Sequence, residues 1–159
     1  MSTITHTNPN GKTVQVNVGE NVTIGEYVLI CENATIGSHS TIGSHSTIGR
    51  NATIGWNATI GEDSYIGSYS IIGENATIGS YSYIGKYAII GKNATIGENA
   101  TIGENATIGK NVTIGSYSTV GKNAIIGENA NIGENSYIVR DAIVGQDATI
   151  AHGSIVGLK

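Results

Sequence analysis

The sequence predicts an all-β solenoid, a rod of very short parallel strands stacked coil upon coil. The first observation is a period of six, because an aliphatic residue recurs at every sixth position from Val18 to Val156, through 24 hexads without a slip. The second is that Gly follows almost every aliphatic, the exceptions being Cys31, Val139 and Ala151. Regular Gly would cost a helix about 1 kcal/mol each, and the apolar positions do not follow a 3.6-residue period. The repeat therefore excludes a helix and favours stacked strands.

One hexad reads Asn-Ala-Thr-Ile-Gly-Glu, and each part of it has a predicted place. Side chains two residues apart share a face of an extended chain, so Ala and Ile point inward and the Thr between them points outward. The remaining Gly-Glu-Asn must turn the chain. Asn, Asp and His, which fill the last turn position in most hexads, are the non-Gly residues that best adopt a positive φ. Tyr, which fills it at Tyr69 and Tyr81, is less easily explained.

The two ends of the chain depart from the repeat. Alternating residues flank a turn signal at residues 8–11, which contains Pro and Gly, so we expect residues 1–12 to form an N-terminal arm or hairpin cap. Residues 13–159 are then the solenoid. We expect no C-terminal helix, because the sequence ends three residues after the last hexad. An uncovered final coil would favour end-to-end growth by strand pairing.

The hexads resemble those of the hexapeptide-repeat family, and the resemblance covers residues 13–156. Chains of that family form left-handed parallel β-helices with three strands in each triangular coil. The resemblance therefore implies about 8 coils of 18 residues, because the period alone fixes only the six-residue unit. It also implies two activities to consider, since many members are trimeric acyltransferases with a coenzyme A thioester donor and a catalytic His between subunits, and others resemble zinc carbonic anhydrases.

Residues 18 apart should stack, which sorts the outward residues into three columns, one on each face of the triangular coil. We number the faces in the order in which the chain reaches them. On the first face we expect a self-association surface, because contiguous exposed apolar residues tend to mark interfaces. Its members are Ile71, Ile89, Ile125 and Ile143. The second face carries a threonine rank, made of Thr23, Thr41, Thr59, Thr77, Thr95, Thr113 and Thr149. Thr suits an exposed strand, and such a rank also resembles the threonine arrays of β-helical antifreeze proteins.

Residues 18 apart also form regular columns on the third face and in the corners. Tyr65 should stack with Tyr83, and Tyr69 with Tyr87. In the corner after the second face, Glu alternates with Ser, which keeps like charges two coils apart. In the corner after the third face, Glu104 falls between two Lys, which is favourable. The Lys92 and Lys110 neighbours, in the corner after the first face, have no explanation in the pattern.

Composition excludes several classes of protein. Eight Lys and Arg against 12 Asp and Glu give a net charge of -4 without a basic patch, so we expect no nucleic-acid partner. No apolar run approaches the roughly 18 residues of a membrane span, and the first residues lack the features of a secretion signal. We therefore expect a soluble, cytoplasmic protein with no membrane partner. One Cys and four scattered His give no zinc spacing, so we expect no metal and no cofactor.

His39 and His45 are the candidate catalytic residues. Both occupy the turn position that Asn fills elsewhere, and they should lie on different corners with no identifiable carboxylate to orient a general base. We interpret both as turn residues. The His152 segment resembles that of the carbonic anhydrases but lacks their second His, because Gly157 stands five residues later. Cys31 takes the place of a corner Gly and has no evident base nearby, so we interpret it as a buried bystander or a free surface thiol and not as a nucleophile.

These features predict a non-catalytic structural or self-assembling β-solenoid, with a second copy of itself as the partner. The homo-oligomer would form laterally or end to end. Near-identical units without inserted loops are typical of an idealised, consensus-like or designed repeat sequence. Two alternatives stay open. One is a hexapeptide-repeat acyltransferase, trimeric and using a coenzyme A thioester, or a degenerate relative; the other is an ice-binding protein that uses the threonine rank.

Overall fold

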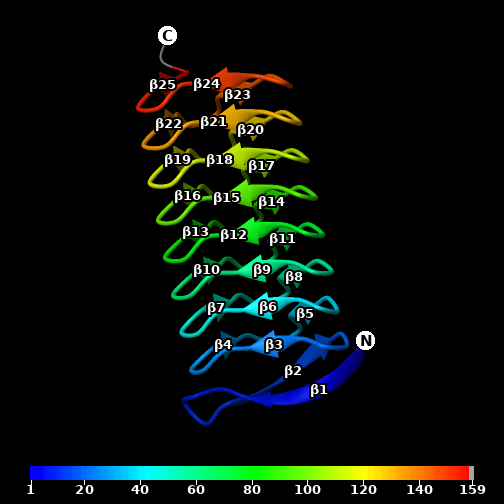
Figure 1. Ribbon diagram of the computed structural model, residues 1–159. Coiled ribbons are helices and arrows are strands. Elements are labelled where there is room, and N and C mark those ends of the chain that lie inside the picture. Colours follow the sequence, from blue (N-terminus) through cyan, green and yellow to red (C-terminus); the bar gives the residue numbers. More distant parts are fainter. Residues whose placement is uncertain (158–159) are drawn as a thin grey trace.

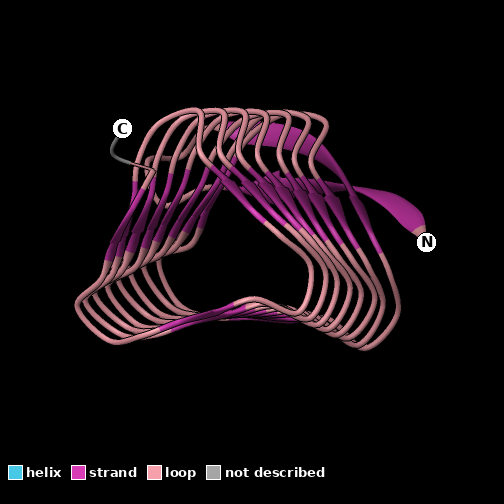
Figure 2. Ribbon diagram, turned by 90° about the horizontal axis from the view of Figure 1, so that it is seen from above, coloured by secondary structure: helices cyan, strands magenta, loops and turns pink. Residues whose placement is uncertain are grey.

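The computed structural model describes residues 1–157, and within them the chain forms a three-sided, left-handed parallel β-helix with no helical segment. The coils stack from the N-terminal hairpin upward (Figure 1), and the view along the rod shows their triangular outline (Figure 2). Strands 18 residues apart pair in register, as Ile71 does with Ile89, so the predicted fold class and coil length are confirmed. Residues 158–159, the last two of the predicted solenoid, lie outside the described residues.

Three sheets form the sides of the prism. The first sheet runs in the order β1 (Ser2–Thr7), β2 (Thr13–Val18), β5 (Thr35–Ile36), β8 (Thr53–Ile54), β11 (Ile71–Ile72), β14 (Ile89–Ile90), β17 (Thr107–Ile108), β20 (Ile125–Ile126) and β23 (Ile143–Val144). The second contains β3 (Thr23–Ile24), β6 (Thr41–Ile42), β9 (Thr59–Ile60), β12 (Thr77–Ile78), β15 (Thr95–Ile96), β18 (Thr113–Ile114), β21 (Asn131–Ile132) and β24 (Thr149–Ile150). The third contains β4 (Leu29–Ile30), β7 (Thr47–Ile48), β10 (Tyr65–Ile66), β13 (Tyr83–Ile84), β16 (Thr101–Ile102), β19 (Thr119–Val120), β22 (Tyr137–Ile138) and β25 (Ile155–Val156).

An N-terminal hairpin closes the lower end of the rod. β1 pairs antiparallel with β2 over its whole length, from Ser2 opposite Val18 to Thr7 opposite Thr13. The turn between them reaches the third sheet through Asn8, whose buried side chain donates to the Ile30 carbonyl and accepts from the Ile30 amide, both at 2.8 Å. Asn8 thus satisfies backbone groups that the edge strand β4 would otherwise leave unpaired.

The core is a stack of the inward aliphatic residues and the small residues two positions before them. Ile36, Ile66 and Ala100 are typical members, each completely buried. Some coils carry Ser in place of the small apolar residue. Most of the buried Ser hydroxyls donate to a corner carbonyl in the next coil, and the Ser70 hydroxyl donates to the Gly67 carbonyl in its own coil. Ser40 Oγ, for example, donates to the Gly55 carbonyl at 2.7 Å. Ser is tolerated in the core because its polar group has a partner.

The corners take the backbone conformation that the sequence predicts. A positive φ occurs at every sixth residue from Asn21 to Asp147. The Asn, Asp and His residues at this position suit it, and five tyrosines adopt it as well, with Tyr81 at φ 60°. The sequence suggests that the corner Gly helps to turn the chain, but the structure gives it a different role. A Cβ on Gly127 would lie 2.5 Å from the backbone nitrogen of Gln146 in the next coil, so Gly is required because adjacent corners stack closely.

Candidate functional site

The first face carries the predicted apolar column. Ile71 pairs with Ile89 and Ile125 with Ile143, while Thr107 lies between the two pairs and contacts a strand of each. The four Ile side chains are exposed by 46%, 43%, 45% and 73%, although equivalent inward Ile residues are buried. The structure therefore gathers all four predicted residues into one exposed stripe along the first sheet.

The second and third faces differ from the first in chemistry. Register in the second sheet aligns the predicted threonine rank, and Asn131 interrupts it between Thr113 and Thr149. On the third face the rings of Tyr65 and Tyr83 stack with centroids 5.0 Å apart and planes at 6°. The Tyr69 and Tyr87 rings stack at 5.2 Å in the corner after this face. Both predicted aromatic pairs are confirmed.

His39 and His45 lie on different corners, as the sequence predicts, and each contacts an aromatic ring. The His39 ring meets Trp56 edge-on with centroids 5.9 Å apart, and the His45 ring stacks on Tyr27 at 5.1 Å. Both histidines adopt the positive φ of the turn position. Within residues 1–157 neither makes a side-chain hydrogen bond to a carboxylate, so the described residues do not assemble them into an acid–base pair. Their catalytic role stays an untested prediction.

The corner charges form ladders between coils. The Glu104 carboxylate accepts a hydrogen bond from Lys122 Nζ at 2.9 Å. This bond, together with the positive charge of Lys122, holds the pKa of Glu104 below its ordinary value of 4.5. The Lys92 and Lys110 neighbours also have an explanation. Lys92 lies 2.9 Å from Glu74, and Lys110 lies 3.7 Å from a Glu on its opposite side, so each Lys turns away from the other.

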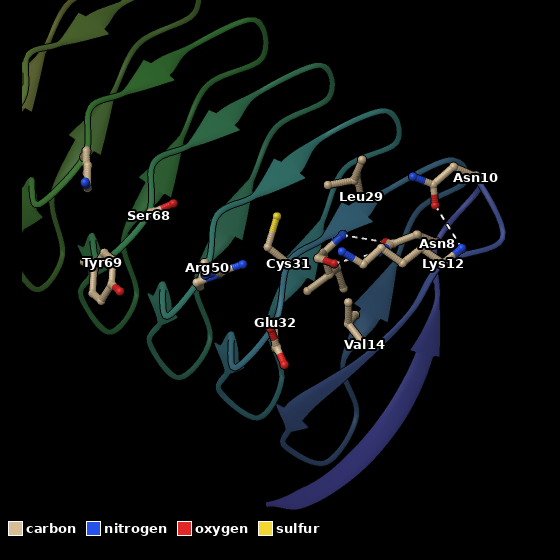
Figure 3. A pocket seen from close by; sticks show the side chains of 12 residues that line it. Asn8, Asn10, Lys12, Val14, Leu29, Cys31, Glu32, Arg50, Ser68 and Tyr69 are labelled. Atoms are coloured by element: carbon tan, nitrogen blue, oxygen red, sulfur yellow. Dashed lines mark hydrogen bonds between the residues drawn. The ribbon is translucent and has the colours of Figure 1, made fainter.

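One concave site, of about 580 Å³, lies where the turn of the N-terminal hairpin faces the corner after the third face. We call this corner the third corner. Asn8, Asn10 and Lys12 form one wall, and Cys31, Glu32, Arg50, Ser68 and Tyr69 form the other (Figure 3). Lys86 also lines the site. Leu29, Ile30 and Val14 complete the lining. Sequence reasoning did not find this site, although residues 32, 50, 68 and 86 share the 18-residue spacing that would have grouped them.

No group of three or more His, Cys, Asp and Glu residues among positions 1–157 is placed to hold a metal ion. No helix of the described chain is long and apolar enough to cross a membrane.

Comparison with known proteins decides the family. The model of the family described as the GMPPB C-terminal domain matches residues 11–86 and, in a second overlapping match, residues 71–158. The two matches together cover nearly the whole repeat. The chain belongs to the GMPPB C-terminal domain family. No curated protein matches its sequence.

This member of the GMPPB C-terminal domain family has the fold of hexapeptide-repeat transferases. A crystal structure of a UDP-N-acetylglucosamine acyltransferase is 16% identical, with a TM-score of 0.61 over 86% of this chain and 66% of that one. The UDP-N-acetylglucosamine acyltransferase from Campylobacter jejuni is 20% identical, with a TM-score of 0.54 over 80% and 64%. A hexapeptide transferase family protein from Anaplasma phagocytophilum is 17% identical, with a TM-score of 0.56 over 86% and 78%.

The predicted membership of the hexapeptide-repeat family is therefore confirmed at the level of fold. The chain of the GMPPB C-terminal domain family spans 64% and 66% of the length of the two acyltransferases. At these identities the likeness establishes the fold alone, and function has to be argued from the surfaces of the rod.

Proposed function

We propose that this chain is a non-catalytic, self-associating β-solenoid, and that its first face binds a second copy of the same chain. The observation that carries the proposal is the stripe of four exposed Ile residues in register on a flat sheet. Thr occupies the equivalent outward position in most other strands, so the strand itself does not require Ile there. Removing each Ile from water contributes roughly 1.5–3 kcal/mol.

The order of the stripe supports a second copy as the partner. Ile71 and Ile89 lie below Thr107, and Ile125 and Ile143 lie above it at the same spacing. The order of Ile and Thr along the stripe is therefore the same from either end. Two copies that pack by a two-fold axis place Ile against Ile whether the rods run parallel or antiparallel, which is the self-complementarity that such an interface needs.

Charges at the edges of the face favour the parallel arrangement. The chain rises one coil in 18 residues, so Glu104 in the third corner lies between the levels of Lys92 and Lys110 in the corner after the first face. In a parallel pair these two corners face each other, and Glu104 meets two cations of the second copy. In an antiparallel pair Glu104 faces Glu104 of the second copy, which is repulsive.

Solution mass tests the proposal. Analytical ultracentrifugation of the parent at tens of micromolar should give a dimer, and the variant with Ile71→Thr, Ile89→Thr, Ile125→Thr and Ile143→Thr should sediment as a monomer. The matched control replaces Tyr65, Tyr83 and Tyr137 of the third face with Thr and should keep the mass of the parent. A monomeric parent, or a quadruple variant that keeps the parent's mass, overturns the proposal.

An acyltransferase is the second candidate, and the fold shared with the two acyltransferases favours it. A catalytic role for His39 or His45 would need a partner subunit to complete a site. The assay mixes the protein with acetyl-coenzyme A and common amine or sugar acceptors. We expect no turnover, and turnover that His39→Ala or His45→Ala abolishes would support the enzyme instead. None of the proteins compared with this chain supports the ice-binding alternative.

A further inference from the structure

The cavity at the third corner lies where two features of the sequence coincide. Cys31 stands where a corner Gly would allow close stacking. The hydrogen bond from the Asn51 amide to the Glu32 carbonyl in the neighbouring coil measures 3.2 Å, and the next two bonds of the same corner, from Tyr69 to Arg50 and from Tyr87 to Ser68, measure 2.9 and 3.1 Å. The hairpin turn, held by Asn8, then adds the opposite wall.

The charge in this cavity is unbalanced. Lys12, Arg50 and Lys86 line it, against the single carboxylate of Glu32. Among the described residues 1–157, none of these four side chains takes part in an ion pair. Lys86 Nζ instead lies 4.8 Å from the centre of the Tyr87 ring. The chain as a whole carries a net charge of -4, so this concave cluster of cations opposes the overall sign.

The geometry of the column suits an anion. Arg50, Ser68 and Lys86 occupy the same corner position in three successive coils, so their Cα atoms are about 5 Å apart in order, with the hydroxyl between the two cations. In Figure 3 the Arg50 side chain extends toward Cys31 along the cavity wall. A guanidinium, a hydroxyl and an ammonium in this order can all donate to one phosphate group, and the guanidinium can do so with two bonds.

We propose that this cavity binds a phosphorylated small molecule, with the phosphate group held by Arg50, Ser68 and Lys86 and the organic part lying toward Lys12 and the apolar Leu29 and Val14. The volume of about 580 Å³ falls in the range of small-molecule sites and exceeds what a lone phosphate fills. The third corner borders the first face, but the lining of the cavity includes none of the four Ile residues, so variants at the Ile residues and variants at Arg50 and Lys86 test the two proposals separately.

Cys31 gives a readout that needs no enzymatic activity. It is the only cysteine in the sequence and it lines the cavity, so its reaction with the uncharged reagent N-ethylmaleimide reports occupancy. Adenosine 5′-monophosphate at millimolar concentration should slow this reaction several-fold and shift the Ser68 amide resonance in a nitrogen-15 NMR titration, and adenosine should do neither. Inorganic phosphate distinguishes the two sources of a phosphate group. If adenosine 5′-monophosphate protects Cys31 at a much lower concentration than inorganic phosphate does, the ligand is a phosphorylated organic molecule.

Variants assign the site to named residues. Arg50→Gln and Lys86→Gln should each weaken protection by about tenfold, since each removes a charge-assisted hydrogen bond. Glu32→Gln should tighten binding, because it removes the one carboxylate that lines the cavity. Arg140→Gln, in the same corner column five coils from Arg50, is the matched control and should change nothing. Each variant is checked for an unchanged circular dichroism spectrum and melting temperature before use.

Three outcomes overturn the proposal. The first is that millimolar adenosine 5′-monophosphate and inorganic phosphate both leave the rate of Cys31 alkylation and the Ser68 amide resonance unchanged. The second is that binding occurs but survives Arg50→Gln and Lys86→Gln, which would place the anion elsewhere. Protection by adenosine equal to that by its monophosphate also contradicts the assigned role of the phosphate group.

Discussion

At the scale of single residues, the turn position before the small inward residue shows how one backbone requirement is met by different side chains. Asn, Asp and His fill it in most coils, and all adopt a positive φ. Tyr residues adopt the same φ, although a bulky side chain is less favourable there than Asn. Tyr69 and Tyr87 stack on each other, which offsets part of this cost. Tyr81 is 62% exposed and makes no aromatic pair among residues 1–157.

Tyr81→Asn should therefore stabilise the protein by roughly 0.5–1 kcal/mol, because Asn tolerates the left-handed backbone that Tyr81 is held in. Urea unfolding followed by circular dichroism measures the change. The control is Thr77→Asn on an exposed strand, which should be neutral or slightly destabilising, since Asn is poor in strands. Loss of stability in Tyr81→Asn would contradict the interpretation of the turn.

The Glu104 carboxyl is the second feature at this scale. Its pKa lies below the ordinary value because Lys122 donates a hydrogen bond to it and attracts it, with a smaller contribution from Lys86. Lys122→Ala should return the pKa toward 4.5, and Lys12→Ala, on the turn of the N-terminal hairpin, should leave it unchanged. A carbon-13 NMR titration of the Glu104 carboxyl measures both variants.

The sign of the pH dependence is set by the direction of this shift. A lowered pKa in the folded state means that the pair stabilises the protein above the unfolded pKa, and this contribution is lost as pH falls through the folded value. The stability difference between the parent and Lys122→Ala should thus shrink below about pH 4.5. A difference that grows on acidification would contradict the pairing.

At the scale of elements, the stacked corners explain why Gly repeats. A Cβ on Gly127 would approach the backbone of Gln146 to 2.5 Å, whereas a Cβ on Gly145, one coil above, meets nothing within 4 Å. The two residues hold the same place in the same corner column. Within the described residues, they differ in that a further coil lies above Gly127 and none lies above Gly145.

Gly127→Ala should cost about 1–3 kcal/mol, because the added carbon overpacks the contact between coils. Gly145→Ala should be nearly neutral. Thermal and urea unfolding of the two variants, side by side, measures the difference. Equal effects in both would mean that corner Gly is required for its dihedral angles and not for the close approach.

At the scale of the whole molecule, every hexad supplies the same inward pattern, so the core does not distinguish one hexad from another. The columns of outward residues do distinguish them, because the outward residue differs from hexad to hexad. Deleting residues 99–104 removes one hexad, keeps the Ile and Ala pattern unbroken, and turns everything after it by one face. Ile125 and Ile143 then leave the column of Ile71 and Ile89. Deleting residues 93–110 removes one whole coil and keeps all four on one face.

Both deletion variants should fold, because stability in a solenoid comes from contacts between neighbouring units. Only the 18-residue deletion should keep the self-association proposed for the first face. Circular dichroism checks the fold and sedimentation measures the mass. Equal masses for the two deletion variants, with the parent associated, would show that the Ile stripe does not hold the copies together.

The sequence by itself determined the repeat and most of the features that depend on local chemistry. Period, inward and outward positions, the positive-φ turn and the tyrosine pairs depend on residues close in sequence or separated by a fixed 18, so counting finds them. Three sides and left-handedness needed the family resemblance. The reason for corner Gly and the pairing of Lys92 with Glu74 were decided by contacts between coils, where distances of a few ångströms count. The cavity also required the tertiary structure, because Asn8 brings a turn from outside the repeat against the third corner.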